Sequence, residues 1–569
     1  MPMPDTQPRF TFLGKLLSLA LIGGFFYFGW QLLQGRELKL PTLPGRGAPA
    51  AEVSEAAQEV PTLAPPAAFQ LGADSVVPIE ISEYAGYAGL IAANGGLEPG
   101  PGSLFPKYCG CRVRLTVSEE ESWSALNSGK LAGSVTTADV LAVYGRQFRV
   151  KVPVQIGFSR GADGILVRSE IKRVNDLKGK LVVAAQFTET DFFIRYLAQE
   201  AGLGITSLNS LDAPPNPATL NLVYTDDGFA AGDLFLADLQ SGKGRLAGAV
   251  TWEPKTSEVM AASGGKARLL VSNRNLLIVA DILVLNQGFA EQHPRLVAGL
   301  VRGLLEGNRL VRDHPESQLA VVAQAFKWSP EQTRNELAKV HLANLPENLA
   351  FFNGSIDAAG SFGGIYQSAV YAYGTGLIRD PVDPARFIDL AALTAADATG
   401  QFRDQTIAIA PIKTGSPAGV ENDPLLSKDI RFFFQPNSAV LDQGQSENLK
   451  NLAAIKELLT VSPGSTILLR GHVDNSLVEE FRRKGGEAFV RQMSLKAVEL
   501  SRDRAGAIQR LLLERYSVQR ARTEIVGRGW DEPAGGDPEQ NRRVEVQWFT
   551  LEGRHAGPFR RFAFPRFFP

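Results

Sequence analysis

Short apolar runs alternate with longer amphipathic stretches through residues 75–411. Runs of four to eight residues rich in Val, Ile and Leu are typical of buried strands, and apolar residues spaced three and four apart indicate helices. Regular alternation of the two predicts α/β domains with largely parallel sheets. The predicted strands include residues 76–81, 180–187 and 276–285, and the predicted helices include residues 191–202 and 294–314.

From Ile430 onward the pattern changes to strand, helix, strand, helix, strand, strand, with the first strand opening at Ile430. Val544, Val546 and Trp548 alternate with polar residues, which predicts a half-buried strand. Two helices are also predicted, each from the spacing of its apolar residues. Their inward faces comprise Leu449, Leu452, Ile455 and Leu459 in one and Ala505, Ile508 and Leu512 in the other.

Residues 16–33 form an uncharged apolar run of 18 residues, just long enough to cross a bilayer as a helix. A cleaved signal peptide is the alternative, but the nearest small-x-small site, residues 48–50, lies well beyond the apolar run. We therefore expect a retained transmembrane anchor preceded by a short cytoplasmic segment, residues 1–15. Residues 34–74 are rich in Pro and Ala and predict an extended spacer. Residues 413–424 predict a second linker, and residues 550–569 form an aromatic, basic tail.

The composition excludes several classes of function. At 569 residues the chain predicts two or three domains. Its 59 Lys and Arg balance 60 Asp and Glu, so no electrostatic argument favours nucleic acid. The five histidines are scattered, and neither a phosphate-binding loop nor a nucleophile elbow occurs, so we expect no catalytic residues and no cofactor. Cys109 and Cys111 form either a disulfide or two free thiols, and no further ligands accompany them to make a metal site.

Several segments of the middle region resemble the substrate-binding proteins of ABC importers, in the branch that binds nitrate, alkanesulfonates, taurine and thiamine precursors. The resemblance implies a two-lobed periplasmic-binding-protein fold of type II across residues 75–412, closing on a small ligand. The first lobe would hold residues 75–167 and the chain after Ile282, and the second would hold residues 175–273. The segments that carry the resemblance are residues 83–97, 126–145, 157–167, 171–203 and 248–254.

Two short motifs mark the expected cleft, because each ends an apolar strand and opens a helix. Thr136, Thr137 and Asp139 form one motif, and Thr188 and Thr190 form the other. Such residues cap helices, but helix starts also bind anionic or polar ligand groups, and both interpretations remain open here. The remaining candidates for ligand contact, each with packing or solvent exposure as the alternative, are Tyr84, Tyr87, Ser159, Arg160, Trp252 and Glu253.

Three motifs near the C-terminus resemble the peptidoglycan-binding domain of OmpA-like proteins: residues 471–475 (GHVDN), 500–505 (LSRDRA) and 541–545 (NRRVE). The resemblance implies a βαβαβ domain over residues 425–549. It also implies that Asp474 and Arg504 bind the diaminopimelate of the peptidoglycan stem, with Arg542 supporting the site. Opposite charges suit that amino acid, which offers both an ammonium and a carboxylate group.

This sequence departs from the OmpA-like pattern in two places. Val473 stands where the family has threonine, and residues 476–499 make the following segment about twice the usual length. A surface insertion is tolerated thermodynamically, yet this one can cover or reshape the pocket.

Together these features predict a single-pass protein of the bacterial inner membrane with most of its chain in the periplasm. The middle domain would capture a small anionic or polar organic ligand for an ABC permease, and the last domain would bind peptidoglycan. The alternative is a wall-tethered sensor or scaffold that is not coupled to transport.

Overall fold

The computed structural model describes residues 53–118, 122–354, 360–409, 425–435, 438–442, 444–460 and 465–549. The expected anchor at residues 16–33, the linker at residues 413–424 and the tail at residues 550–569 lie outside these residues. Within the described residues, no helix combines the length and the apolar character that a membrane crossing requires.

Six strands form the sheet of the first lobe, in the order β12-β4-β11-β3-β1-β2. β1 runs parallel to β2 and β3, whereas the later strand β11 is antiparallel to both β3 and β4. The strands are β1 (Val76–Ile81), β2 (Arg112–Val117), β3 (Gly133–Thr137), β4 (Val150–Ser159), β11 (Ala280–Asn286) and β12 (Val340–Leu342).

A second six-stranded sheet has the order β10-β5-β9-β6-β8-β7. The chain enters it after β4 and returns to the first sheet after β10, so two connections join two lobes. The expectation that the first lobe extends to Val167 is wrong, because β5 belongs to the second sheet. The strands are β5 (Asp163–Arg168), β6 (Leu181–Ala185), β7 (Ile205–Ser207), β8 (Leu220–Thr225), β9 (Gly248–Trp252) and β10 (Ala267–Ser272).

Helices follow the strands of both lobes, as the alternating pattern predicts. The second lobe contains α6 (Glu189–Glu200), α7 (Gly228–Ser241) and α8 (Lys255–Ala262). The first lobe begins with the 3-10 helix η1 (Ala85–Tyr87), α2 (Ala88–Asn94), α3 (Phe105–Cys109), α4 (Trp123–Asn127) and α5 (Val140–Tyr144). After β11 come α9 (Gln287–Gln292), α10 (Pro294–Asp313), α11 (Pro315–Phe326), α12 (Pro330–Leu337), α13 (Leu345–Asn353), α14 (Phe362–Leu377) and α15 (Ala391–Ala398).

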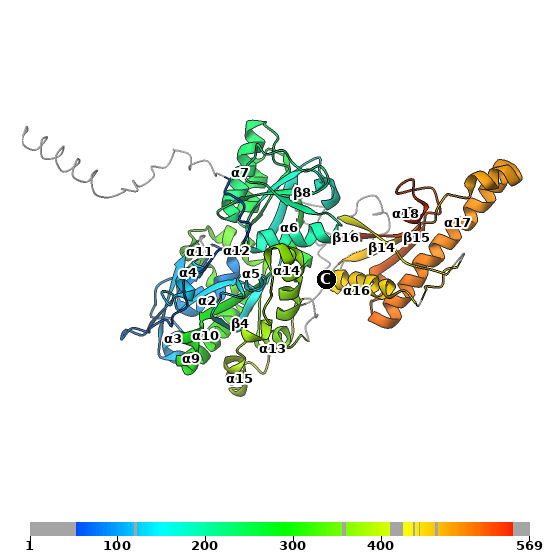
Figure 1. The fold of residues 1–569 in the computed structure, drawn as a ribbon. Coiled ribbons are helices and arrows are strands. Elements are labelled where there is room, and N and C mark those ends of the chain that lie inside the picture. Colours follow the sequence, from blue (N-terminus) through cyan, green and yellow to red (C-terminus); the bar gives the residue numbers. More distant parts are fainter. Residues whose placement is uncertain are drawn as a thin grey trace, which may run out of the picture. The chain divides into compact units, whose positions relative to one another are not determined.

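Two of these helices show how packing fixes the lobes. α10 lies against α2, and a Cβ atom at Gly307 would come within 2.0 Å of the carbonyl oxygen of Gly89. Glycine at position 307 therefore permits a helix–helix approach that any side chain would prevent. α14 packs against both α5 of the first lobe and α6 of the second (Figure 1).

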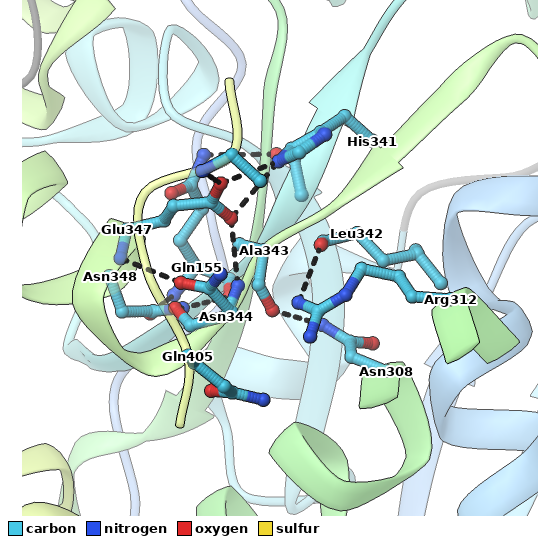
Figure 2. Close-up of polar contacts among 12 residues, drawn as sticks. Gln155, Asn308, Arg312, His341, Leu342, Ala343, Asn344, Glu347, Asn348 and Gln405 are labelled. Carbon is cyan, nitrogen blue, oxygen red and sulfur yellow. Dashed lines mark hydrogen bonds and ion pairs between the residues drawn. The ribbon is translucent and has the colours of Figure 1, made fainter. Parts of the chain in front are cut away.

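A buried polar network joins β4, β12 and α13 (Figure 2). Asn348 accepts a 2.7 Å hydrogen bond from the backbone N–H of Gln155, and Asn344 and Glu347 cap the start of α13 reciprocally. His341 Nε2 lies 3.0 Å from the Glu347 carboxylate. Burial acts to raise the pKa of Glu347, but His341 and the Asn344 N–H outweigh it and lower that pKa. These contacts give His341 a structural role.

The second half of the expected spacer, residues 53–71, contacts both lobes. Ser54 donates its backbone N–H to Tyr224 of the second lobe, and Ala57 donates to the side chain of Gln186. Farther along, Leu63 donates to Gln147 of the first lobe at 2.7 Å. This part of the chain is therefore extended, as the composition predicts, but it follows the surface of the two-lobed domain.

Cys109 and Cys111 form a disulfide across Gly110 at the end of α3. The sequence left a disulfide and two free thiols as alternatives, and the structure selects the disulfide. Gly110 has a φ of 64°, a left-handed conformation that glycine adopts without steric cost.

The C-terminal domain is a four-stranded sheet in the order β13-β16-β14-β15. β14 and β15 are parallel, and β16 is antiparallel to both of its neighbours. The elements are β13 (Leu426–Ile430), α16 (Ser446–Thr460), β14 (Thr466–Gly471), α17 (Val478–Tyr516), β15 (Thr523–Gly527), α18 (Pro538–Asn541) and β16 (Val544–Phe549).

Three expectations for this domain need correction. The first strand ends at Ile430, where the sequence predicted that it begins. Leu449 is 45% exposed, although it shares the spacing of the buried Leu452. All six residues of β16 are buried, because this strand is central and Glu545 pairs with Arg470 of β14.

Residues 476–499 continue α17 toward its N-terminus, interrupted at Gly485 and Gly486. Gly486 has a φ of 64° and a ψ of −166°, a conformation that only glycine adopts readily. Beyond the bend, Phe481 contacts Phe489 and Trp530, with ring centroids 5.7 and 6.1 Å apart. The insertion is therefore a bent helical arm fixed by aromatic packing.

Candidate functional site

A cavity of about 290 Å³ is lined by residues from both lobes, most of them at the carboxyl ends of strands, with Asp163 and Asp281 at the starts of β5 and β11. β1, β2 and β3 contribute from the first sheet, and β6, β8 and β9 contribute from the second. Ligands of α/β sheets gather at this edge, where helix N-termini also lie. Six of the predicted contact residues line the cavity: Tyr84, Tyr87, Thr136, Thr137, Thr188 and Trp252.

Three other predicted residues are buried outside the cavity lining. Asp139 is fully buried at the start of α5. Ser159 donates its hydroxyl to Asp163, and Thr190 places its hydroxyl 2.8 Å from that of Thr188. Ser159 and Thr190 therefore support residues that line the cavity.

Arg160 and Glu253 also lie outside the cavity lining. Arg160 Nε donates to the backbone carbonyl of Arg274 at 3.0 Å. Glu253 forms a 2.8 Å ion pair with Lys339 and accepts hydrogen bonds from Ser257. Glu253 is thus paired with a basic side chain, and Arg160 is hydrogen-bonded to a backbone carbonyl.

The two helix starts differ in how they use their polar residues. Thr188 caps α6 by accepting a hydrogen bond from the Thr190 N–H at 3.2 Å, and it also lines the cavity. At α5 the side chain of Asp139 makes no capping bond. Helix capping therefore explains the motif at Thr188, but it does not explain the motif at Asp139.

Sequence reasoning missed the carboxyl groups of this cavity. Asp281 lies within an apolar run that predicts a buried strand, and Asp163 lies next to a small-residue turn, so neither suggested a ligand contact. An acid inside a fully apolar strand is the signal that would have found Asp281, because buried carboxylates are rare unless paired. The carboxyl groups that line the cavity belong to Glu80, Asp163, Glu189, Asp226, Asp227 and Asp281.

Burial perturbs the acids in and behind this cavity. It raises the pKa of Asp281 well above its usual value, and the charge of Asp163 adds to the effect, while Tyr87 and Tyr84 oppose it. Burial raises the pKa of Asp163 to about 6 despite hydrogen bonds from Ser159 and Asn273. It also raises the pKa of Asp139 to about 7.

A second pocket, of about 400 Å³, lies in the C-terminal domain and brings together Asp474, Arg504 and Arg542. Asp474 pairs with Arg542 Nε at 3.3 Å. Arg504 donates to the carbonyl of Ser438 at 3.1 Å and lies over the ring of Phe434. Burial lowers the pKa of Arg504, as does the neighbouring Arg542, while Asp474 opposes this shift.

The insertion forms part of this second pocket. Leu477, Phe481, Met493 and Lys496 all line it, together with Val473. The added helical arm therefore gives the pocket an apolar wall and one more positive charge.

Comparisons with known proteins matched two different parts of the chain, the C-terminal domain and the two-lobed region before it. Residues 433–547 match the model of the OmpA family. No curated protein matches the chain. Similar solved structures include the aliphatic sulphonate-binding protein SsuA from Escherichia coli, at 17% identity, a TM-score of 0.42 and coverage of 56% of this chain and 99% of that one.

Two further structures have comparable scores. SsuA from Xanthomonas axonopodis pv. citri, bound to MOPS, has 15% identity and a TM-score of 0.41 over 57% of this chain and 99% of its own. The desulfurization enzyme DSZB has 15% identity and a TM-score of 0.39 over 57% of this chain and 100% of its own. Residues 433–547 thus belong to an OmpA domain, and the residues before it form two six-stranded sheets joined by two connections.

Proposed function

We propose that this protein is a solute-binding protein of the cell envelope that captures a small molecule between its two lobes and binds peptidoglycan through its OmpA domain. The main support is the cavity at the carboxyl ends of strands from both lobes. Its wall includes Trp252, which is 9% exposed and whose indole N–H has no hydrogen-bond partner among the described residues. A buried donor without a partner favours a polar ligand, because leaving such a group unsatisfied is costly.

Lobe closure is the proposed mechanism of capture. Two connections join the sheets, and the proposed closure is a rotation of the lobes about them. A ligand that contacts both lobes would stabilise the closed arrangement by its greater affinity for that state. Residues for such two-sided contact are available at Thr136 and Thr137 in the first lobe and at Thr188 in the second.

Peptidoglycan binding rests on the second pocket. In our proposal Arg504 binds the carboxylate of diaminopimelate and Asp474 binds its ammonium group. The Asp474–Arg542 pair, at 3.3 Å, would open or rotate to admit that ammonium. Arg542 then supports the site by holding Asp474 in place in the empty pocket.

We propose that the protein delivers the captured solute to an ABC permease. An inner-membrane anchor at residues 16–33 would hold the protein on the periplasmic side, near such a partner. The OmpA domain favours a second candidate, a wall-bound sensor, because attachment to peptidoglycan restricts the diffusion that a shuttling protein needs. Uptake of the identified solute by cells with and without the gene distinguishes the two.

A thermal-shift screen of the purified full chain tests solute capture. The panel should contain sulfonates, nitrate, phosphate, amino acids, amines and pyrimidines. A compound that binds the native state raises the unfolding temperature in proportion to the logarithm of its concentration above Kd. The proposal fails if no compound of this panel changes the unfolding of the two-lobed domain.

A further inference from the structure

The cavity between the lobes is strongly acidic. Six carboxyl groups line it, and its described lining contains no Lys, Arg or His. A sulfonate, nitrate or phosphate group would therefore meet negative charge there without a cation to balance it. Because burying an unbalanced charge is costly, the lining disfavours an anionic ligand.

Two basic side chains of the two-lobed domain already have acidic partners. Arg195 is buried in a 2.7 Å ion pair with Asp191 and also donates to Tyr224. Lys339 lies between Glu253 and Glu336, at 2.8 and 3.0 Å. Neither cation is available to neutralise the acids of the cavity lining.

Two aspartates form the centre of the acidic lining. Asp281 is 2% exposed; its Oδ1 accepts a 3.3 Å hydrogen bond from Tyr87, while Oδ2 has no partner among the described residues. Asp163 is 3% exposed and accepts hydrogen bonds from Ser159 and Asn273. Buried carboxylates are stable when they are paired with a positive charge. No such partner is recorded for Asp281 among the described residues.

Aromatic rings surround these carboxyl groups. Cations bind the faces of aromatic rings, and the attraction increases when water is excluded. Tyr84 and Tyr87 pack edge to face with centroids 5.3 Å apart, next to the two aspartates. The rings that line the cavity belong to Tyr84, Tyr87, Trp123, Tyr144 and Trp252.

A bare metal ion fits this cavity less well than a molecular cation. Three or more closely spaced His, Cys, Asp or Glu donors occur once among the described residues, at His472, Glu532 and Glu545 of the C-terminal domain. Arg470 already binds both of those glutamates. The cavity acids are instead distributed around a volume of about 290 Å³, which suits a ligand of several heavy atoms.

We propose that the solute is an organic cation whose alkylammonium group is bound by Asp281 and Asp163 within the aromatic lining. This inference rests on the proposed solute-binding function and names the chemical class of its ligand. Thr136, Thr137, Thr188 and the Trp252 indole N–H remain to bind polar groups on the rest of the molecule.

Matched probes test the charge directly. Choline and its neutral carbon isostere dimethylbutanol have nearly the same shape, and putrescine and ethanesulfonate extend the set to a protonated amine and an anion. Titration calorimetry and thermal shift on the full chain should show binding of choline or putrescine. The isostere should bind at least about tenfold more weakly, because it lacks the charge that the carboxylates bind.

A pair of variants locates the binding site. Asp281→Asn keeps the side-chain shape, and we expect it to weaken binding of the cation at least about tenfold. Asp212→Asn changes an exposed acid of the second lobe, with a side chain 87% exposed, and should leave binding unchanged. The unfolding temperature of each unliganded variant shows whether it is folded.

The outcomes separate this inference from the proposed function. Binding of ethanesulfonate but neither cation, or equal binding of choline and its isostere, overturns the cation assignment and leaves solute capture standing. Stabilisation by Zn²⁺ or Mg²⁺ alone also overturns it. No binding by any probe, cationic or otherwise, contradicts both.

Discussion

The two pockets of this protein carry opposite charges. The cavity between the lobes is lined by six carboxyl groups and, among its described lining residues, no basic side chain. Among its described lining residues, the pocket of the OmpA domain has Asp474 as its one carboxylate, together with Arg431, Lys496, Arg504 and Arg542. A formal net charge of −1 for the whole chain conceals this contrast. Net charge therefore excludes a broad basic surface but reveals nothing about individual sites.

The pockets also differ in how their charges are balanced by protein partners. Asp474 already has a protein partner in Arg542, whereas Asp281 has one carboxylate oxygen without any described partner. A ligand with both an ammonium and a carboxylate suits the first arrangement. A ligand that is positively charged suits the second. Complementarity of charge thus predicts different ligands for two pockets of similar size.

Removing one cation from the OmpA pocket should have the largest effect. We expect Arg504→Ala to reduce co-sedimentation with purified peptidoglycan at least about tenfold, because a buried charge-assisted contact is lost. Arg510→Ala, an exposed change on the same helix, is the matched control. Pelleting of the Arg504 variant at the level of the control would reject this site.

The second-largest expected effect is destabilisation of the OmpA domain by acid. Burial acts to raise the pKa of Glu545, but His472 and Arg470 outweigh it and hold that pKa at about 2. A lowered native pKa stabilises the fold above the unfolded value near 4.5, and this contribution is lost as the pH falls toward 2. It is on the order of 2 kcal/mol for this largely buried group.

Hydrogen exchange of the β16 amides measures this loss of stability. Rates are recorded on the full chain between pH 5 and 2.5 and corrected for intrinsic exchange. Glu545→Gln removes the titrating group and should flatten the dependence. A variant with the slope of the parent protein would show that another group is responsible.

Local patterns predicted the elements of this protein well. Residues 76–81 form β1, and the runs at residues 191–202 and 294–314 lie in α6 and α10. Asp474 and Arg504 share a pocket, as their motifs imply. These predictions succeeded because periodicity and short motifs are local, and the fold then places carboxyl ends of strands together.

Features set by distant contacts could not be predicted in the same way. Glu545 looked like the exposed side of a half-buried strand, but its partner Arg470 lies on another strand. Asp281 looked like an interruption in an apolar run, and its neighbour Asp163 comes from the other sheet. The expected anionic or polar ligand rested on two helix starts and on the resemblance to binders of nitrate and sulfonates. Neither reveals the sign of the side chains that surround the cavity.

The acidic cavity should cost the unliganded protein stability. Asp281→Asn removes a buried ionisable group whose pKa burial raises, while it keeps the side-chain volume. We expect the unliganded variant to unfold at a higher temperature than the parent, by up to roughly 2 °C for about 1 kcal/mol in a domain this large. Differential scanning calorimetry measures this. A lower unfolding temperature would mean that the carboxylate stabilises the empty cleft.

The last prediction is a pH dependence of the two-lobed domain that is opposite in sign to that of Glu545. The pKa values of Asp139 and Asp163 are raised to about 7 and about 6, first by burial. Their contribution to stability is therefore complete below the unfolded pKa near 4 and is lost as the pH rises through 6 to 7. The other ionisable groups around them are Tyr84, Tyr87, Glu189, Asp191 paired with Arg195, Glu253 paired with Lys339, and Asp281.

The unliganded two-lobed domain should accordingly unfold at a higher temperature at pH 5.5 than at pH 8. The increase in unfolding temperature that choline or putrescine causes should instead be larger at pH 8 than at pH 5.5, because only ionised carboxylates attract a cation. Thermal shifts measured with and without the cation at both pH values test the two trends together. A cation effect that is larger at pH 5.5 would place the bound charge away from Asp163, and the contrast between the two pockets would no longer rest on these aspartates.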